Sequence, residues 1–217
     1  MNNILKATKL DLMIIKQYKS TAIWLILCCI AIGIGFQNII IGTVWAMCII
    51  GIKCLSITFD AEEREGIKKL YEFIPLSSAH KVSGRYLFCV STGTILSVII
   101  IALQSVINLL KDQSKLSVTE IFTAFFLGTA IMLFNVSYQF PVYYKFGIVK
   151  GRMSGLAIIM ILGAVAGAFV MRDRFSLNTF IRPLSEYFVL SVIAFLITVL
   201  CTFISLMISI KIYKTKK

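Results

Sequence analysis

Residues 60–74, with the sequence DAEEREGIKKLYEFI, form a charged segment between two long apolar runs. Asp60 is a favourable N-cap residue, and Glu63 three positions later completes a capping-box pattern. Acidic residues precede basic ones along the segment, as the helix dipole favours. Apolar side chains recur with the i, i+3, i+4, i+7 spacing of one helical face, at Ile67, Leu70, Tyr71 and Ile74. The pattern predicts a short amphipathic helix that Pro75 ends.

The charged face of this predicted helix has two interpretations. A helix that rests on anionic lipid is usually plainly basic, whereas this face carries both signs of charge. That mixture favours a docking surface for another protein, made by Asp60, Glu62, Glu63, Arg64 and Glu65. An interfacial helix or a solvated loop is the alternative, and the residues alone leave both open.

Composition places the chain among integral membrane proteins. Of its 217 residues 59% are hydrophobic, and the mean hydropathy is +0.91. The net charge of +12 could suggest a nucleic-acid partner. However, the basic residues flank apolar runs instead of forming a patch, so membrane topology explains them and no nucleic acid is expected. The sequence therefore predicts an all-α, polytopic membrane protein.

The apolar runs divide the chain into spans and connections. About 20 apolar residues cross a bilayer core, and six such runs follow an amphipathic N-terminal segment. We expect one transmembrane domain, 1–217, whose six spans lie near residues 21–41, 43–58, 86–110, 118–140, 154–171 and 188–210. The remaining parts are an interfacial helix at 1–20, a first cytoplasmic loop at 59–85, a second at 141–153 and an extracellular re-entrant segment at 172–187. Spans 1–2 thus fall within 21–58, spans 3–4 within 86–140 and spans 5–6 within 154–210.

Charge predicts the orientation of these spans. With both termini in the cytoplasm, most of the 22 basic residues lie on the cytoplasmic side. Because basic residues are retained on that side, this arrangement is favoured over its inverse. The segment 60–74 is then expected to face the cytoplasm.

The sequence contains no pattern typical of a catalytic, cofactor or metal site. The G-x-x-x-x-G-K-[ST] phosphate loop is missing, so the chain is not expected to bind ATP itself. His80 is the single histidine, which argues against metalloprotease chemistry and histidine-based triads. All six cysteines lie in apolar runs, where thiols act as small hydrophobic side chains.

Polar and small residues inside the spans suggest helix contacts or a substrate path. Gln37 and Asn38 lie at the outer end of the first span, and Gly163 and Gly167 form a GxxxG motif in the fifth. Amides also occur in the third and fourth spans, at Gln104, Asn108, Asn135 and Gln139. Hydrogen bonds and close packing between helices are the commoner use of such residues. A substrate path or a dimer interface is the alternative.

Two stretches carry a family resemblance. Residues 59–87, FDAEEREGIKKLYEFIPLSSAHKVSGRYL, and residues 141–152, PVYYKFGIVKGR, resemble the permease subunits of bacterial ABC-2-type exporters. More specifically, they resemble the compact group that includes permeases exporting phenol-soluble modulin toxins. The resemblance implies that 60–74 is a coupling helix that rests on a separate ATPase subunit. The candidate site residues of the second cytoplasmic loop are Lys145, Phe146, Gly147, Lys150 and Arg152.

The resemblance also implies partners and a location. ATP and Mg would be bound by a separate ABC ATPase subunit, and two permeases, identical or related, would associate in the bacterial cytoplasmic membrane. The substrate would be an amphipathic peptide. Three alternatives remain: an efflux or immunity permease for a drug or bacteriocin, a non-transport scaffold or sensor anchor, and an enzyme acting in the bilayer. The scarcity of ionisable residues in the spans counts against the enzyme.

Overall fold

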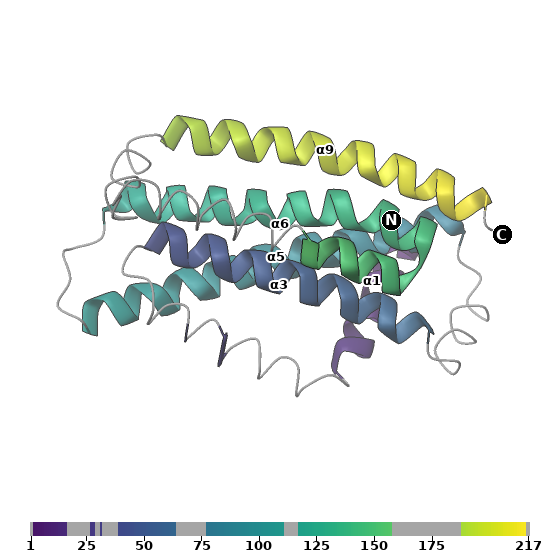
Figure 1. The fold of residues 1–217 in the computed structure, drawn as a ribbon, viewed down its shortest axis with the longest axis horizontal. Coiled ribbons are helices and arrows are strands. Elements are labelled where there is room, and N and C mark those ends of the chain that lie inside the picture. Colours follow the sequence, from purple (N-terminus) through teal and green to yellow (C-terminus); the bar gives the residue numbers. More distant parts are fainter. Residues whose placement is uncertain are drawn as a thin grey trace.

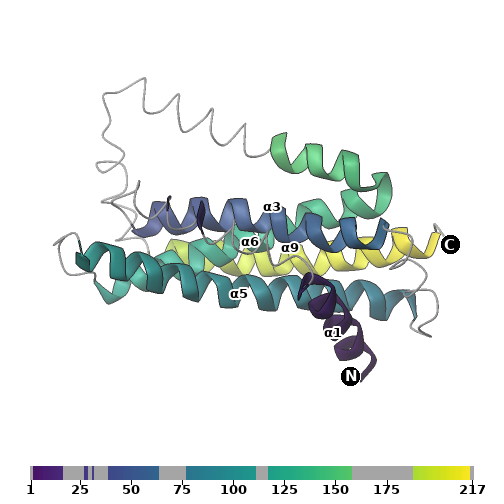
Figure 2. The same ribbon diagram turned by 90° about the horizontal axis from the view of Figure 1, so that it is seen from below.

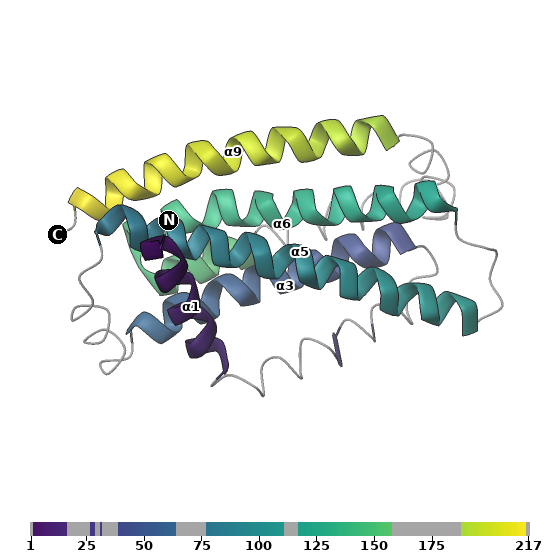
Figure 3. The same ribbon diagram turned by 180° about the vertical axis from the view of Figure 1, so that it is seen from behind.

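The computed structural model describes residues 2–16, 27, 28, 31, 39–63, 77–110, 117–157 and 188–215. These parts are almost entirely helical. The helices are α1 (Asn2–Lys16), α3 (Ile39–Glu63), α5 (Ser78–Leu110), α6 (Val118–Phe146) and α9 (Phe188–Thr215), with a further helix at 148–157. Helices α3, α5, α6 and α9 lie lengthwise in one bundle (Figure 1), and α1 crosses α5 steeply (Figures 2 and 3).

Three described helices are long and apolar enough to cross a membrane. They are α5 with 33 residues, α6 with 29 and α9 with 28. A shorter apolar helix covers Ile39–Lys53. The all-helical class is confirmed for the described residues. Most of the expected first span and most of the fifth lie outside the described residues, so the expected total of six spans stays a prediction.

Helix α3 differs from the expected arrangement at both ends. It begins at Ile39, inside the stretch assigned to the first span, and it continues through Asp60 to Glu63. The prediction that Asp60 begins a new helix as its N-cap is therefore wrong. Phe59 is buried against rings of α6, and the Asp60 carboxylate binds a side chain from a distant helix. These tertiary contacts continue the helix where the local capping pattern favoured a start.

The second predicted loop, 141–153, is helical apart from one residue. Helix α6 runs to Phe146, and helix 148–157 follows after Gly147. Gly147 has φ 82°, a conformation that favours glycine, and its N–H donates to the Tyr143 carbonyl at 2.9 Å. The chain therefore reverses its direction at Gly147 alone, where a longer loop was predicted.

The N-terminal end of α6 is closed by a capping box. The Ser117 hydroxyl accepts from the Glu120 N–H at 3.1 Å, and the Glu120 carboxylate accepts from the Ser117 N–H at 3.1 Å. This capping box confirms the predicted start at Val118. It also explains why an acidic residue stands at the edge of an apolar span.

Pro141 lies inside α6, where it cannot donate a hydrogen bond to the Ser137 carbonyl one turn earlier. The Ser205 hydroxyl of α9 donates to that carbonyl instead, at 2.6 Å. Because Ser205 uses its proton there, the Tyr86 hydroxyl donates to Ser205 at 2.7 Å and accepts from Ser209 at 2.9 Å. One chain of hydrogen bonds thus joins α5, α9 and α6 at the proline.

The Ser205 hydroxyl takes the place of the N–H that Pro141 lacks, and this replacement can be tested by mutation. Ser205→Ala should lower the free energy of unfolding by about 1 kcal/mol, because it leaves the partly buried Ser137 carbonyl without a donor. In a Pro141→Ala background the same change should cost less, since the restored N–H can take its place. Thermal melts of the four proteins in detergent measure both costs. Equal costs in the two backgrounds would contradict the assignment.

Candidate functional site

Aromatic side chains join four helices at the end of the bundle where α3, α6 and α9 finish. The Phe59 ring stacks on Tyr143 at 4.6 Å between centroids and meets Phe140 at 5.4 Å. Tyr86 stacks on Phe140 at 4.3 Å. We call the whole group the aromatic cluster; it comprises Phe59, Tyr86, Phe140, Tyr143, Tyr144 and Tyr213. Such pairs add specific geometry to apolar burial, so α3 is fixed firmly on α6.

A buried cation connects this cluster to α1. The Arg85 guanidinium of α5 lies 5.0 Å from the centre of the Phe59 ring, and its Nε is 4.0 Å from Asp11 Oδ1 of α1. Gly84 lets α1 approach closely, since a Cβ there would lie 2.6 Å from that of Ala7. The predicted N-terminal helix is present and packs on α5. Sequence reasoning assigned Arg85 only to topology and missed this buried contact.

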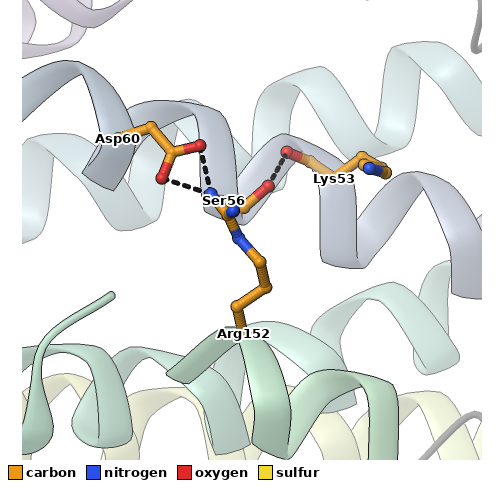
Figure 4. A network of polar contacts seen from close by, with 4 residues as sticks. All are labelled: Lys53, Ser56, Asp60 and Arg152. Atoms are coloured by element: carbon orange, nitrogen blue, oxygen red, sulfur yellow. Dashed lines mark hydrogen bonds and ion pairs between the residues drawn. The ribbon is translucent and has the colours of Figure 1, made fainter. Parts of the chain in front are cut away.

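An ion pair connects the end of α3 to helix 148–157. Both carboxylate oxygens of Asp60 lie 2.5 Å from Nη2 of Arg152, as Figure 4 shows. One turn earlier on α3, the Ser56 hydroxyl donates to the Lys53 carbonyl at 2.9 Å, so this bond is separate from the Asp60–Arg152 pair. The side chains are 33% and 48% exposed, so the pair holds two elements together weakly. It brings together the two segments that the sequence marked separately.

Helix 148–157 rests on α6 through glycine. A Cβ on Gly151 would lie 2.4 Å from the Tyr143 ring, and one on Gly155 would lie 2.8 Å from Gln139 Nε2. Together they form a GxxxG spacing that the sequence prediction overlooked, because Gly151 was assigned to a loop. A side chain at position 151 would displace the Tyr143 ring or the helix, whereas one at position 155 would displace only the flexible amide of Gln139.

The turn between these helices presents a mixed basic and apolar surface. Lys145 Nζ lies 5.2 Å and Lys150 Nζ 5.7 Å from the centre of the Phe146 ring. Phe146, Val149 and Met153 are all more than half exposed. We call these five residues the 145–153 surface.

Several predicted site residues lie outside the described part of the chain. They are Arg64, Glu65, Ile67, Leu70, Tyr71 and Ile74 of the coupling segment, and Gln37, Asn38, Gly163 and Gly167 of the spans. Glu62 and Glu63 are described only as helical backbone in the last turn of α3. Among the described residues, no three His, Cys, Asp or Glu side chains are grouped as metal ligands would be.

A family model described as "ABC-2 family transporter protein" matches residues 8–214. The chain belongs to the ABC-2 transporter family. This ABC-2 protein is thus a multi-pass membrane protein and a transport subunit of the kind that generally works with an ABC ATPase and is not catalytic itself. Neither the curated proteins nor the solved structures include a match to it.

Proposed function

We propose that this chain is the permease subunit of an ATP-driven exporter, coupled to a separate ATPase through residues 60–74 and the 145–153 surface. The observation that carries the proposal is the Asp60–Arg152 pair, which joins both segments in a member of the ABC-2 family. ATP and Mg would be bound by the partner. A second permease, identical or related, would complete the complex.

The geometry suggests how work could reach the membrane. Helix α3 is one rod from Ile39 to Glu63 and leads directly into the segment expected to contact the ATPase. The aromatic cluster holds α3 on α6, whereas helix 148–157 is held to α3 by an exposed ion pair worth about 0–1 kcal/mol. The exposed ion pair is the weaker of these two connections, so we expect it to open first. Movement of the ATPase against residues 60–74 would therefore release helix 148–157 while α3 and α6 stay together.

The proposed substrate is an amphipathic peptide, exported across a bacterial cytoplasmic membrane with both termini of the permease in the cytoplasm. The resemblance to modulin exporters and the buried amides of the spans support it. A second candidate, a permease for a small hydrophobic drug, is favoured by an apolar groove of about 310 Å³ between α5, α6 and α9. A groove of that size suits a drug-sized molecule.

Co-expression with the ATPase encoded by a neighbouring reading frame tests the proposal. The two chains should purify together, and candidate peptides should stimulate ATP hydrolysis. Reversing Glu62, Glu63 and Glu65 to lysine should reduce ATPase recovery about tenfold or more, because charge complementarity is lost at the interface.

The matched control is Asp112→Lys, which changes an acidic residue in a connection predicted to lie outside the cell. It should leave recovery and stimulation unchanged. Normal export by the triple variant would show that 60–74 is not the coupling segment. A scaffold, in contrast, would bind a partner whose hydrolysis no peptide alters.

A further inference from the structure

Helix α6 carries a column of buried polar side chains at Asn135, Gln139 and Tyr143, one turn apart on one face. They are 1%, 0% and 3% exposed. Asn135 donates to the Ile131 carbonyl at 3.1 Å and lies beside the Cys48 thiol. Within the described part of the chain, neither amide atom of Gln139 nor the Tyr143 hydroxyl has a hydrogen-bond partner.

An unpaired amide in the interior is unfavourable, because it loses its bonds to water and gains none in return. Gln104 differs in part, since its Oε1 accepts from Thr43 at 2.9 Å, whereas its Nε2 has no hydrogen-bond partner among the described residues. Gln139 is fully buried, and neither end of its amide is bonded to any residue that the structure describes. A different state of the protein, or a ligand, would supply the bonds that the closed arrangement withholds.

Helix 148–157 is what covers Gln139. Gly155 lies directly over the amide and Gly151 over the Tyr143 ring, so backbone rather than side chains closes the site. The helix is attached through the Gly147 turn at one end and the Asp60–Arg152 pair near it. Displacing this helix would take Gly155 away from the Gln139 amide and Gly151 away from the Tyr143 ring, while the stack of Phe59 on Tyr143 joins only α3 and α6.

We propose that the face of α6 at Gln139 is a binding site for a peptide group of the exported substrate, exposed when helix 148–157 moves away. Nε2 of Gln139 donates to the substrate carbonyl, its Oε1 accepts from the substrate N–H, and the Tyr143 hydroxyl donates to a neighbouring carbonyl. This inference rests on the proposed function. Even a helical peptide offers such groups, since its first and last turns carry unpaired N–H and C=O groups. A hydrocarbon chain offers neither.

The test measures binding of a fluorescent, synthetic amphipathic peptide to the complete permease–ATPase complex in lipid nanodiscs, with and without ATP, because the site is closed until helix 148–157 moves. Gln139→Leu should bind about tenfold more weakly than wild type, the change expected for losing a paired donor and acceptor. A peptide with N-methylated terminal amides should lose a similar factor on wild type and no further factor on Gln139→Leu. Gln104→Leu makes the same chemical change in a buried amide that lies beside Gly42 of α3 and whose Oε1 is bonded to Thr43, and its peptide affinity should stay at the wild-type value.

A stability measurement guards against misfolding. Gln139→Leu preserves volume and removes unpaired groups, so its melting temperature should not fall. Wild-type peptide affinity in this variant, no binding by wild type, or a lower melting temperature would each overturn the site; the last would mean that the amide is paired in the closed state. Failure of the proposed function has a different signature, namely a wild-type chain that recovers no ATPase.

Discussion

Reversing either charge of the Asp60–Arg152 pair is expected to uncouple ATP hydrolysis from export. Asp60→Arg or Arg152→Asp places like charges where the pair now holds helix 148–157 to α3, so the helix is released without the ATPase. Peptide-dependent stimulation of hydrolysis should fall about tenfold, within the range of ordinary coupling energies. The measurement is ATP hydrolysis and peptide uptake into inverted vesicles containing the complete complex.

The double variant decides whether the pair itself matters. Asp60→Arg combined with Arg152→Asp rebuilds the pair with opposite polarity, and coupling should return. Because both side chains are partly exposed, each single reversal should change the free energy of unfolding by no more than about 1 kcal/mol. Lys214→Asp is the matched control, since Lys214 is an exposed cation at the same end of the bundle, in the last turn of α9 and outside both proposed contact segments. A double variant as defective as the singles would mean that the two residues act separately.

Apolar length was sufficient to predict much of the bundle. Helices α5, α6 and α9 coincide with predicted spans because a run of apolar residues long enough to cross a bilayer is itself the physical cause of a spanning helix. The start of α6 was also predictable, since Ser117 and Glu120 are only three positions apart. Local rules work where the stabilising partners are close in sequence.

Contacts between distant residues explain the errors. Asp60 has the composition of an N-cap, but Arg152 lies 92 positions away and no local pattern shows their pairing. The fourth span was also predicted to end at residue 140, whereas α6 continues past Pro141 and Ser205 of α9 supplies the missing hydrogen bond. The GxxxG spacing of Gly151 and Gly155 is present in the sequence, but it was not interpreted as helix packing because 141–153 was predicted to be a loop.

The account requires helix 148–157 to leave α6 during each transport cycle, and a disulfide between these helices tests that claim most directly. A Cβ at position 151 lies 2.8 Å from Cγ of Tyr143, one bond from the Tyr143 Cβ, so cysteines at 143 and 151 are within disulfide reach. Tyr143→Cys and Gly151→Cys are combined in a chain whose six native cysteines are replaced. The two single variants serve as controls for the oxidant.

Peptide export by the reconstituted complex is then measured before oxidation, after oxidation and after reduction. Because Tyr143 belongs to the aromatic cluster and to the proposed site, each variant is compared only with its own reduced form. The account predicts that the remaining export of the double variant stops on oxidation and recovers on reduction, while oxidation leaves each single variant at its own reduced rate. Export by the cross-linked protein at the rate of its reduced form would contradict it, because transport would then proceed with helix 148–157 held on α6.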